Sequence, residues 1–134
     1  MKRGINMSDA TGIETYDIVD PKGNLIVQIV IEPADVNIVQ RYTEVTQDIN
    51  KVKMKVIKGA KKTRGKFIKC LEEANKQAFE RINYLLGAEV AKALLSIMGA
   101  FSPMSSGQFF IEYILDIIGG IIDKEIGLNS TKQH

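Results

Sequence analysis

The sequence predicts a mainly α-helical fold of the α+β class, with about four helices in a compact bundle and a small N-terminal β-hairpin. A run rich in β-branched residues follows a Pro- and Gly-containing turn, which is typical of a hairpin. Further along, apolar residues recur every three or four positions in several stretches, which is typical of amphipathic helices. The chain has 134 residues, the length of one domain.

The hairpin is predicted around the turn Asp-Pro-Lys-Gly-Asn at residues 20–24, because Pro and Gly favour tight turns. Residues 16–19 and 25–31 flank this turn as strands. A lone hairpin is marginally stable in water, so we expect it to pack on a helix or to pair with another chain. Residues 1–14 are predicted to be a flexible lead-in.

The first helix is predicted to run from about Pro33 into the mid-50s. Proline suits a first helical turn, and the acids Glu32 and Asp35 favour the positive end of a helix. Spacings of three and four residues then separate the members of an apolar stripe: Tyr42, Val45, Ile49, Val52 and Val56. This spacing indicates a helix that packs one face on the core, and a coiled-coil seam with a second chain is the alternative.

Gly59 and Gly65 predict a flexible loop, with the second helix starting near Lys66. The apolar stripe of that helix contains Phe67, Leu71, Ala74, Ala78, Ile82 and Leu85. Gly87 follows it and suits the left-handed conformation that ends many helices. Cys70 lies within this helix, where we expect a buried structural thiol.

A short third helix is predicted over residues 88–98, closed by Gly99, and a connector with Ser105 or Ser106 as a cap leads to a fourth helix over residues 108–125. The glycines at 119 and 120 lower the helix propensity there and predict a kink. Residues 127–134 are predicted to be a flexible tail, so that residues 15–126 form the single helical domain.

The fourth helix is unusually apolar, because ten of the 14 positions from 109 to 122 carry large apolar side chains. Such a helix is either central to the domain or meets another molecule, and both can hold. The candidate apolar partner-binding residues are Phe109, Phe110, Tyr113, Ile114, Ile117, Ile118 and Ile121. Glu112 and Asp116 share one face of this helix and could hold Mg²⁺ or act as acid and base, but the favoured interpretation is a solvated edge.

The net charge of +2 conceals a basic segment, because residues 51–69 contain nine Lys and Arg residues and no acid, which leaves −7 for the rest of the chain. The segment could neutralise nucleic-acid phosphates, contact an acidic protein or a neighbouring copy, or remain a solvated loop. The candidate basic partner-binding residues are Lys58, Lys61, Lys62, Arg64 and Lys66.

The inventory of reactive residues predicts a protein that is not an enzyme. Cys70 is the single cysteine and His134 the single histidine, so neither a disulfide, nor a usual zinc site, nor a well-held nucleophile and base pair is expected. No glycine-rich phosphate loop is present, and we expect no cofactor and no catalytic or metal-binding residue. No stretch reaches the ~20 apolar residues of a bilayer span, so no membrane partner is expected.

The order of these parts resembles the tail assembly chaperones of long-tailed bacteriophages. The stretches that carry the resemblance are residues 24–49, the sequence NYLLGAEVAKAL at 83–94 and the sequence QFFIEYI at 108–114. The resemblance implies a helical protein of the host cytoplasm that binds the tape measure protein and keeps it soluble during tail tube assembly. It also implies self-association and, as a further partner, the tail tube protein.

The alternative is a small nucleic-acid-binding protein that uses the basic segment 51–69. That segment has one aromatic residue, Phe67, and no stacking platform or recognition helix, which makes nucleic acid the less favoured partner.

Overall fold

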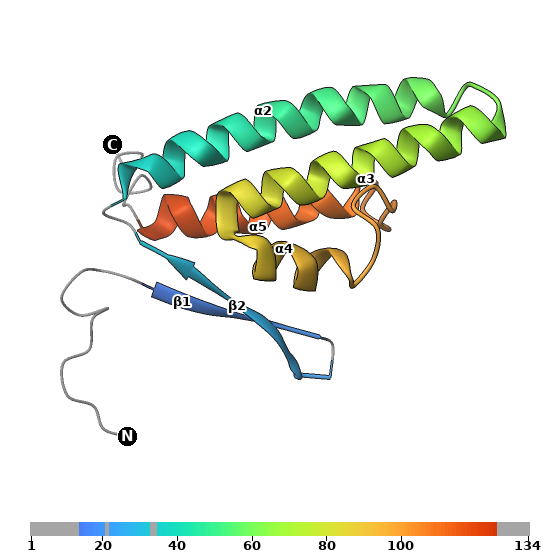
Figure 1. Ribbon diagram of the computed structural model, residues 1–134. Coiled ribbons are helices and arrows are strands. Elements are labelled where there is room, and N and C mark those ends of the chain that lie inside the picture. Colours follow the sequence, from blue (N-terminus) through green and yellow to red (C-terminus); the bar gives the residue numbers. More distant parts are fainter. Residues whose placement is uncertain (1–13, 21, 33–34, 126–134) are drawn as a thin grey trace, which may run out of the picture.

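The computed structural model describes residues 14–20, 22–32 and 35–125, which form two strands and four helices (Figure 1). This architecture confirms the predicted mainly helical fold with a small hairpin near the N-terminus. The predicted tail at 127–134 lies outside the described residues. So does the predicted lead-in, except for its last residue, Glu14, which opens the first strand.

The hairpin consists of β1 (Glu14–Val19) and β2 (Leu25–Ile31), paired antiparallel with Tyr16 opposite Ile29. Its turn follows the expected chemistry, because the Asp20 carboxylate accepts hydrogen bonds at 2.9 Å from the backbone N–H groups of Lys22 and Asn24. One face of the hairpin is buried through Ile29 and Ile31, and the other face, which carries Val30, is exposed.

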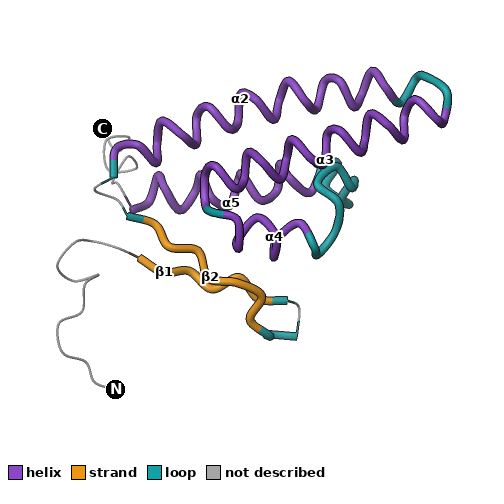
Figure 2. Tube along the Cα trace, viewed as in Figure 1, coloured by secondary structure: helices purple, strands orange, loops and turns teal. Residues whose placement is uncertain are grey.

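Two long antiparallel helices, α2 (Val36–Gly59) and α3 (Arg64–Leu86), lie side by side along the molecule (Figures 1 and 2). The predicted start of the first helix near Pro33 is wrong, because α2 begins only after Asp35. The Asp35 carboxylate caps the helix by accepting a 2.9 Å hydrogen bond from the Asn37 N–H. Asp35 therefore precedes the helix as its cap, instead of lying within its first turn.

A loop joins the two helices where the sequence predicts one, but it is shorter than expected, because α2 includes Gly59, α3 begins at Arg64 and only residues 60–63 separate them. Thr63 caps α3, and its hydroxyl accepts a hydrogen bond from the Lys66 N–H at 3.4 Å. Gly59 is buried at the end of α2, where a Cβ atom would lie 3.0 Å from the Cys70 Sγ. This glycine therefore allows two helices to approach closely instead of opening a loop. Cys70 itself is half-buried, and not fully buried as expected.

The remaining helices are α4 (Ala88–Leu95) and α5 (Phe110–Glu125). Gly87 separates α3 from α4 with a φ of +101°, as the sequence predicted. The third predicted helix is too long, because α4 ends before Ser96, whose hydroxyl donates to the Ala93 carbonyl. In α5 the helix continues through both predicted kink glycines, 119 and 120.

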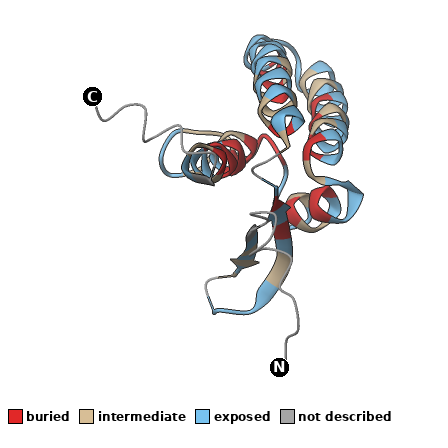
Figure 3. Ribbon diagram, turned by 90° about the vertical axis from the view of Figure 1, so that its left-hand side faces the viewer, coloured by how far each residue is buried: buried red, intermediate tan, exposed pale blue. Residues whose placement is uncertain are grey.

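The core lies where the α2–α3 pair, α5, α4 and the hairpin converge, and the end-on view in Figure 3 shows buried segments facing this centre. Helix α5 packs on α2, and α4 packs on both α3 and β2. The largest fully buried side chains are Ile29, Ile31, Val45, Ile82, Ile111, Ile118 and Ile122. No helix within the described part of the chain is long and apolar enough to cross a membrane.

Candidate partner-binding surfaces

An apolar groove of about 310 Å³ opens where the hairpin, α4 and α5 meet. It is lined by Asp17, Ile18, Val19, Asp20, Ile26, Ile29, Leu94, Ile97, Phe110, Tyr113, Ile114, Ile117 and Ile118. The groove exists because α5 is apolar on more than one face. One face packs on the core, and the adjacent face forms the groove together with the hairpin and α4.

The structure brings five of the seven predicted apolar partner-binding residues into this groove and leaves out Phe109 and Ile121. The five differ in burial. Three of them belong to the core, namely Phe110, Ile114 and Ile118. Only Tyr113, with 43% of its surface exposed, and Ile117, with 38%, present substantial area to a partner. Phe109 instead packs edge-on against Phe101, with ring centroids 5.3 Å apart.

Sequence reasoning missed the share of the groove that the hairpin and α4 provide. Ile18 and Ile29 lie on the inward face of the hairpin, and Leu94 and Ile97 come from α4 and the turn that follows it. The alternation along the strands indicates which hairpin residues share a face. No local pattern indicates that this face lies beside α5, because that depends on packing between distant segments.

The groove carries negative charge at its rim. In the part of the chain that the structure describes, the charged residues that line it are Asp17 and Asp20, and none is Lys or Arg. The Asp17 carboxylate accepts a 2.9 Å hydrogen bond from the Gln28 side chain, and Asp20 holds the hairpin turn. An apolar floor with two carboxylates at its edge favours a partner that combines an apolar stripe with basic side chains.

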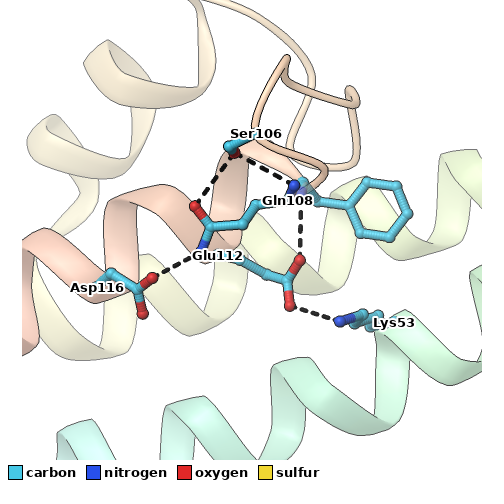
Figure 4. A network of polar contacts seen from close by, with 6 residues as sticks. Lys53, Ser106, Gln108, Glu112 and Asp116 are labelled. Atoms are coloured by element: carbon cyan, nitrogen blue, oxygen red, sulfur yellow. Dashed lines mark hydrogen bonds and ion pairs between the residues drawn. The ribbon is translucent and has the colours of Figure 1, made fainter.

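Glu112 and Asp116 do not form the solvated pair that their spacing suggested (Figure 4). Glu112 reaches the Lys53 ammonium on α2 at 2.7 Å, and its other oxygen accepts the Phe109 N–H at 3.0 Å. Asp116 is exposed and accepts a 2.6 Å hydrogen bond from the Gln108 side chain. The solvated-edge interpretation therefore holds for Asp116 and is wrong for Glu112, which fastens α5 to α2.

The pKa of Glu112 reflects these contacts. Burial by itself would raise the pKa, but the hydrogen bonds from Lys53 and from the Phe109 N–H, with the positive charge of Lys53, favour the ionised form and together hold the pKa below its ordinary value. Glu112 is therefore an ionised clamp that orients α5, and with it the groove.

A second surface lies at the far end of the α2–α3 pair, beyond α5 in Figure 1. It is a shallow depression lined by Lys55, Lys58, Gly59, Lys62, Lys66, Lys69 and Cys70. We call its lysines (Lys55, Lys58, Lys62, Lys66 and Lys69) the five-lysine face.

Three of the five predicted basic residues, Lys58, Lys62 and Lys66, belong to the five-lysine face. Lys61 and Arg64 are exposed but do not line it. Sequence reasoning did not select Lys55 and Lys69. The spacing of 55 and 58, which places these two residues on one side of a helix, was the available signal for Lys55.

Within the described residues, no group of three or more His, Cys, Asp or Glu side chains is placed to hold a metal ion. No protein-family model, no curated protein and no solved structure matches the chain.

Proposed function

We propose that the protein is a non-enzymatic tail assembly chaperone of a long-tailed bacteriophage, which binds the tape measure protein in the host cytoplasm and keeps it soluble during tail tube assembly. The observation that carries the proposal is the apolar groove between the hairpin, α4 and α5, with Tyr113 and Ile117 exposed within it. The resemblance of the sequence pattern to this chaperone family supports the same function.

The groove fits an amphipathic helix of the client. A helix can lay its apolar stripe, repeating every three or four residues, along an apolar channel. Asp17 and Asp20 at the rim add a preference for Lys or Arg beside that stripe. A long helical client with exposed apolar stripes aggregates when unprotected, and shielding a stripe requires contact area and no reactive side chain. Self-association and the tail tube protein remain further proposed contacts of the same chaperone.

The test is co-expression with a coiled-coil-rich segment of the tape measure protein from the same phage. We expect the wild-type protein to raise the fraction of that segment that stays in the supernatant after centrifugation. The double variant Tyr113→Gln/Ile117→Gln removes the exposed apolar area that α5 contributes to the groove and should strongly reduce the increase.

A matched control is available on another surface. Ile57 on α2 is 40% exposed, close to the 38% of Ile117, and does not line the groove. The variant Ile57→Gln should keep full solubilisation. If the wild-type protein fails to solubilise the segment, or if Ile57→Gln reduces its solubility as much as Tyr113→Gln/Ile117→Gln does, the proposed function is wrong.

A further inference from the structure

The five-lysine face concentrates positive charge on two rigid helices. Lys55 and Lys58 lie on α2, Lys62 lies in the tight turn, and Lys66 and Lys69 lie on α3. None of the described residues that line the depression between them carries a carboxylate. Five like charges therefore face one shallow surface.

The basic residues that form ion pairs lie elsewhere. Within the described residues, the ion pairs join Arg41 to Asp35, Lys53 to Glu112, and Arg81 to Asp48. None of the five lysines takes part in one. Lys53 belongs to the same basic segment but points toward α5, where it forms an ion pair within the fold. The five lysines of the face remain available to solvent or to a partner.

The close packing of α2 on α3 holds the face in register. The Cys70 thiol donates to the Lys55 carbonyl at 3.4 Å, and Gly59 lets the two helices approach at this point. Four of the five lysines therefore stand on packed helices, and Lys62 lies in the four-residue turn that joins them. Binding then mainly orders lysine side chains.

We infer that the five-lysine face binds the phosphate backbone of nucleic acid without reading its sequence. Lys55 and Lys58 lie three residues apart on α2, which is about 4.5 Å along the helix axis at ~1.5 Å per residue. That is comparable to the ~3.4 Å between successive phosphates along one strand of B-DNA. Lysine ammonium groups act as point charges that suit phosphate oxygens in many orientations.

The composition of the face favours phosphates over an acidic protein. Protein interfaces are depleted of Lys and enriched in aromatic residues, Met and Arg. Among the described residues that line the depression there is no aromatic residue, no Met and no Arg, and the lining residues other than the lysines are Gly59 and Cys70. The same absence of aromatic and guanidinium groups from the lining removes base stacking and bidentate readout, so binding is electrostatic and independent of sequence.

The experiment measures fluorescence anisotropy of a labelled 30-base-pair DNA duplex of arbitrary sequence, titrated with the full chain between 50 and 200 mM salt. With five phosphates neutralised, the log–log slope approaches about −4.5, which is a loss of about 500-fold in affinity over that range. A flat titration at the lowest salt overturns the inference.

Two double variants with the same change in net charge distinguish a defined face from general attraction. Lys58→Gln/Lys62→Gln removes two charges from the face, and the salt slope should become shallower by about 1.8. Lys61→Gln/Arg64→Gln removes two charges beside the face and should leave the slope unchanged. Equal weakening by both pairs contradicts the assignment of the face. Circular dichroism confirms that both variants are folded.

Two further arms test the class of ligand and the independence of the two surfaces. Vesicles containing an anionic phospholipid and a polyglutamate peptide replace the duplex, and binding to either one with no binding to the duplex overturns the inference. The groove variant Tyr113→Gln/Ile117→Gln should bind the duplex as the wild type does. Lys58→Gln/Lys62→Gln should still solubilise the client, so failure of one proposal is distinguishable from failure of the other.

Discussion

The two candidate surfaces lie on different elements and are built in different ways, the groove between the hairpin, α4 and α5 and the five-lysine face at the end of the α2–α3 pair. The apolar groove shares its floor with the hydrophobic core, because Phe110, Ile114 and Ile118 line the groove and are buried at the same time. The five-lysine face contributes only its backbone to the packed fold, because all five lysine side chains are exposed, on two packed helices and the turn between them.

The difference teaches which surface can change without affecting the fold. Apolar area exposed to a partner and apolar area buried in the core belong to the same helix α5, so substitutions in the groove act on binding and on stability together. Charge on the surface of α2 and α3 is separate from the core, so binding there can be altered while stability stays nearly constant.

The largest change in stability is expected from a substitution in the floor of the groove. Ile118 is 1% exposed, and Ile118→Ala should lower the free energy of unfolding by about 3 kcal/mol, because it loses buried area and leaves a cavity. Ile117→Ala, one residue away and 38% exposed, should lower it by less than about 1 kcal/mol. Urea denaturation measures both free energies of unfolding. Equal losses would contradict the assignment of Ile118 to the core and of Ile117 to the surface.

Replacing each of the two adjacent glycines of α5 with Ala should change the stability of the protein in opposite directions. A Cβ atom at Gly119 would lie 2.8 Å from Tyr42 Cζ and closer still to the hydroxyl oxygen, which donates to the Leu115 carbonyl. Gly119→Ala should therefore destabilise the protein by about 2 kcal/mol through overpacking. Gly120 has no atom within 4 Å of such a Cβ, so Gly120→Ala should stabilise it by up to about 1 kcal/mol through helix propensity. Thermal denaturation followed by circular dichroism gives both signs.

The clamp between α2 and α5 should depend on pH. Because the pKa of Glu112 is held below its ordinary value of 4.5, its contribution to stability is complete above that value and disappears as the pH falls through the lowered pKa. At pH 7, Glu112→Gln should lower the free energy of unfolding by about 1 kcal/mol. The difference between wild type and variant should shrink in urea titrations at progressively lower pH. A difference that grows on acidification would contradict the assignment.

The smallest expected effect on stability is at the five-lysine face. Lys58→Gln/Lys62→Gln relieves repulsion among like charges but removes a favourable charge from the last turn of α2, so the free energy of unfolding should change by less than about 0.5 kcal/mol. Chemical denaturation checks this. A loss above about 1 kcal/mol would mean that the lysine side chains stabilise the fold, and it would contradict the proposed difference between the two surfaces.

Much of the fold was predictable because its signals are local. The hairpin turn, the apolar stripes and the role of Gly87 depend on residues within a few positions of one another. Gly59 was misjudged because a glycine that opens a loop and one that lets a helix approach look the same in a sequence. Only the position of Cys70 on the neighbouring helix decides between them.

The sequence by itself determined the four helices, the hairpin, the excess of apolar residues in α5 and the basic block at residues 51–69. Tertiary structure alone decided which face of α5 lines the groove, that Glu112 meets Lys53, and which five lysines converge. The physical reason is the separation along the chain of the residues that interact. Helix and strand periodicity are fixed by neighbours along the chain, whereas contacts such as Tyr42 to Leu115, 73 positions apart, arise only when packing brings the elements together.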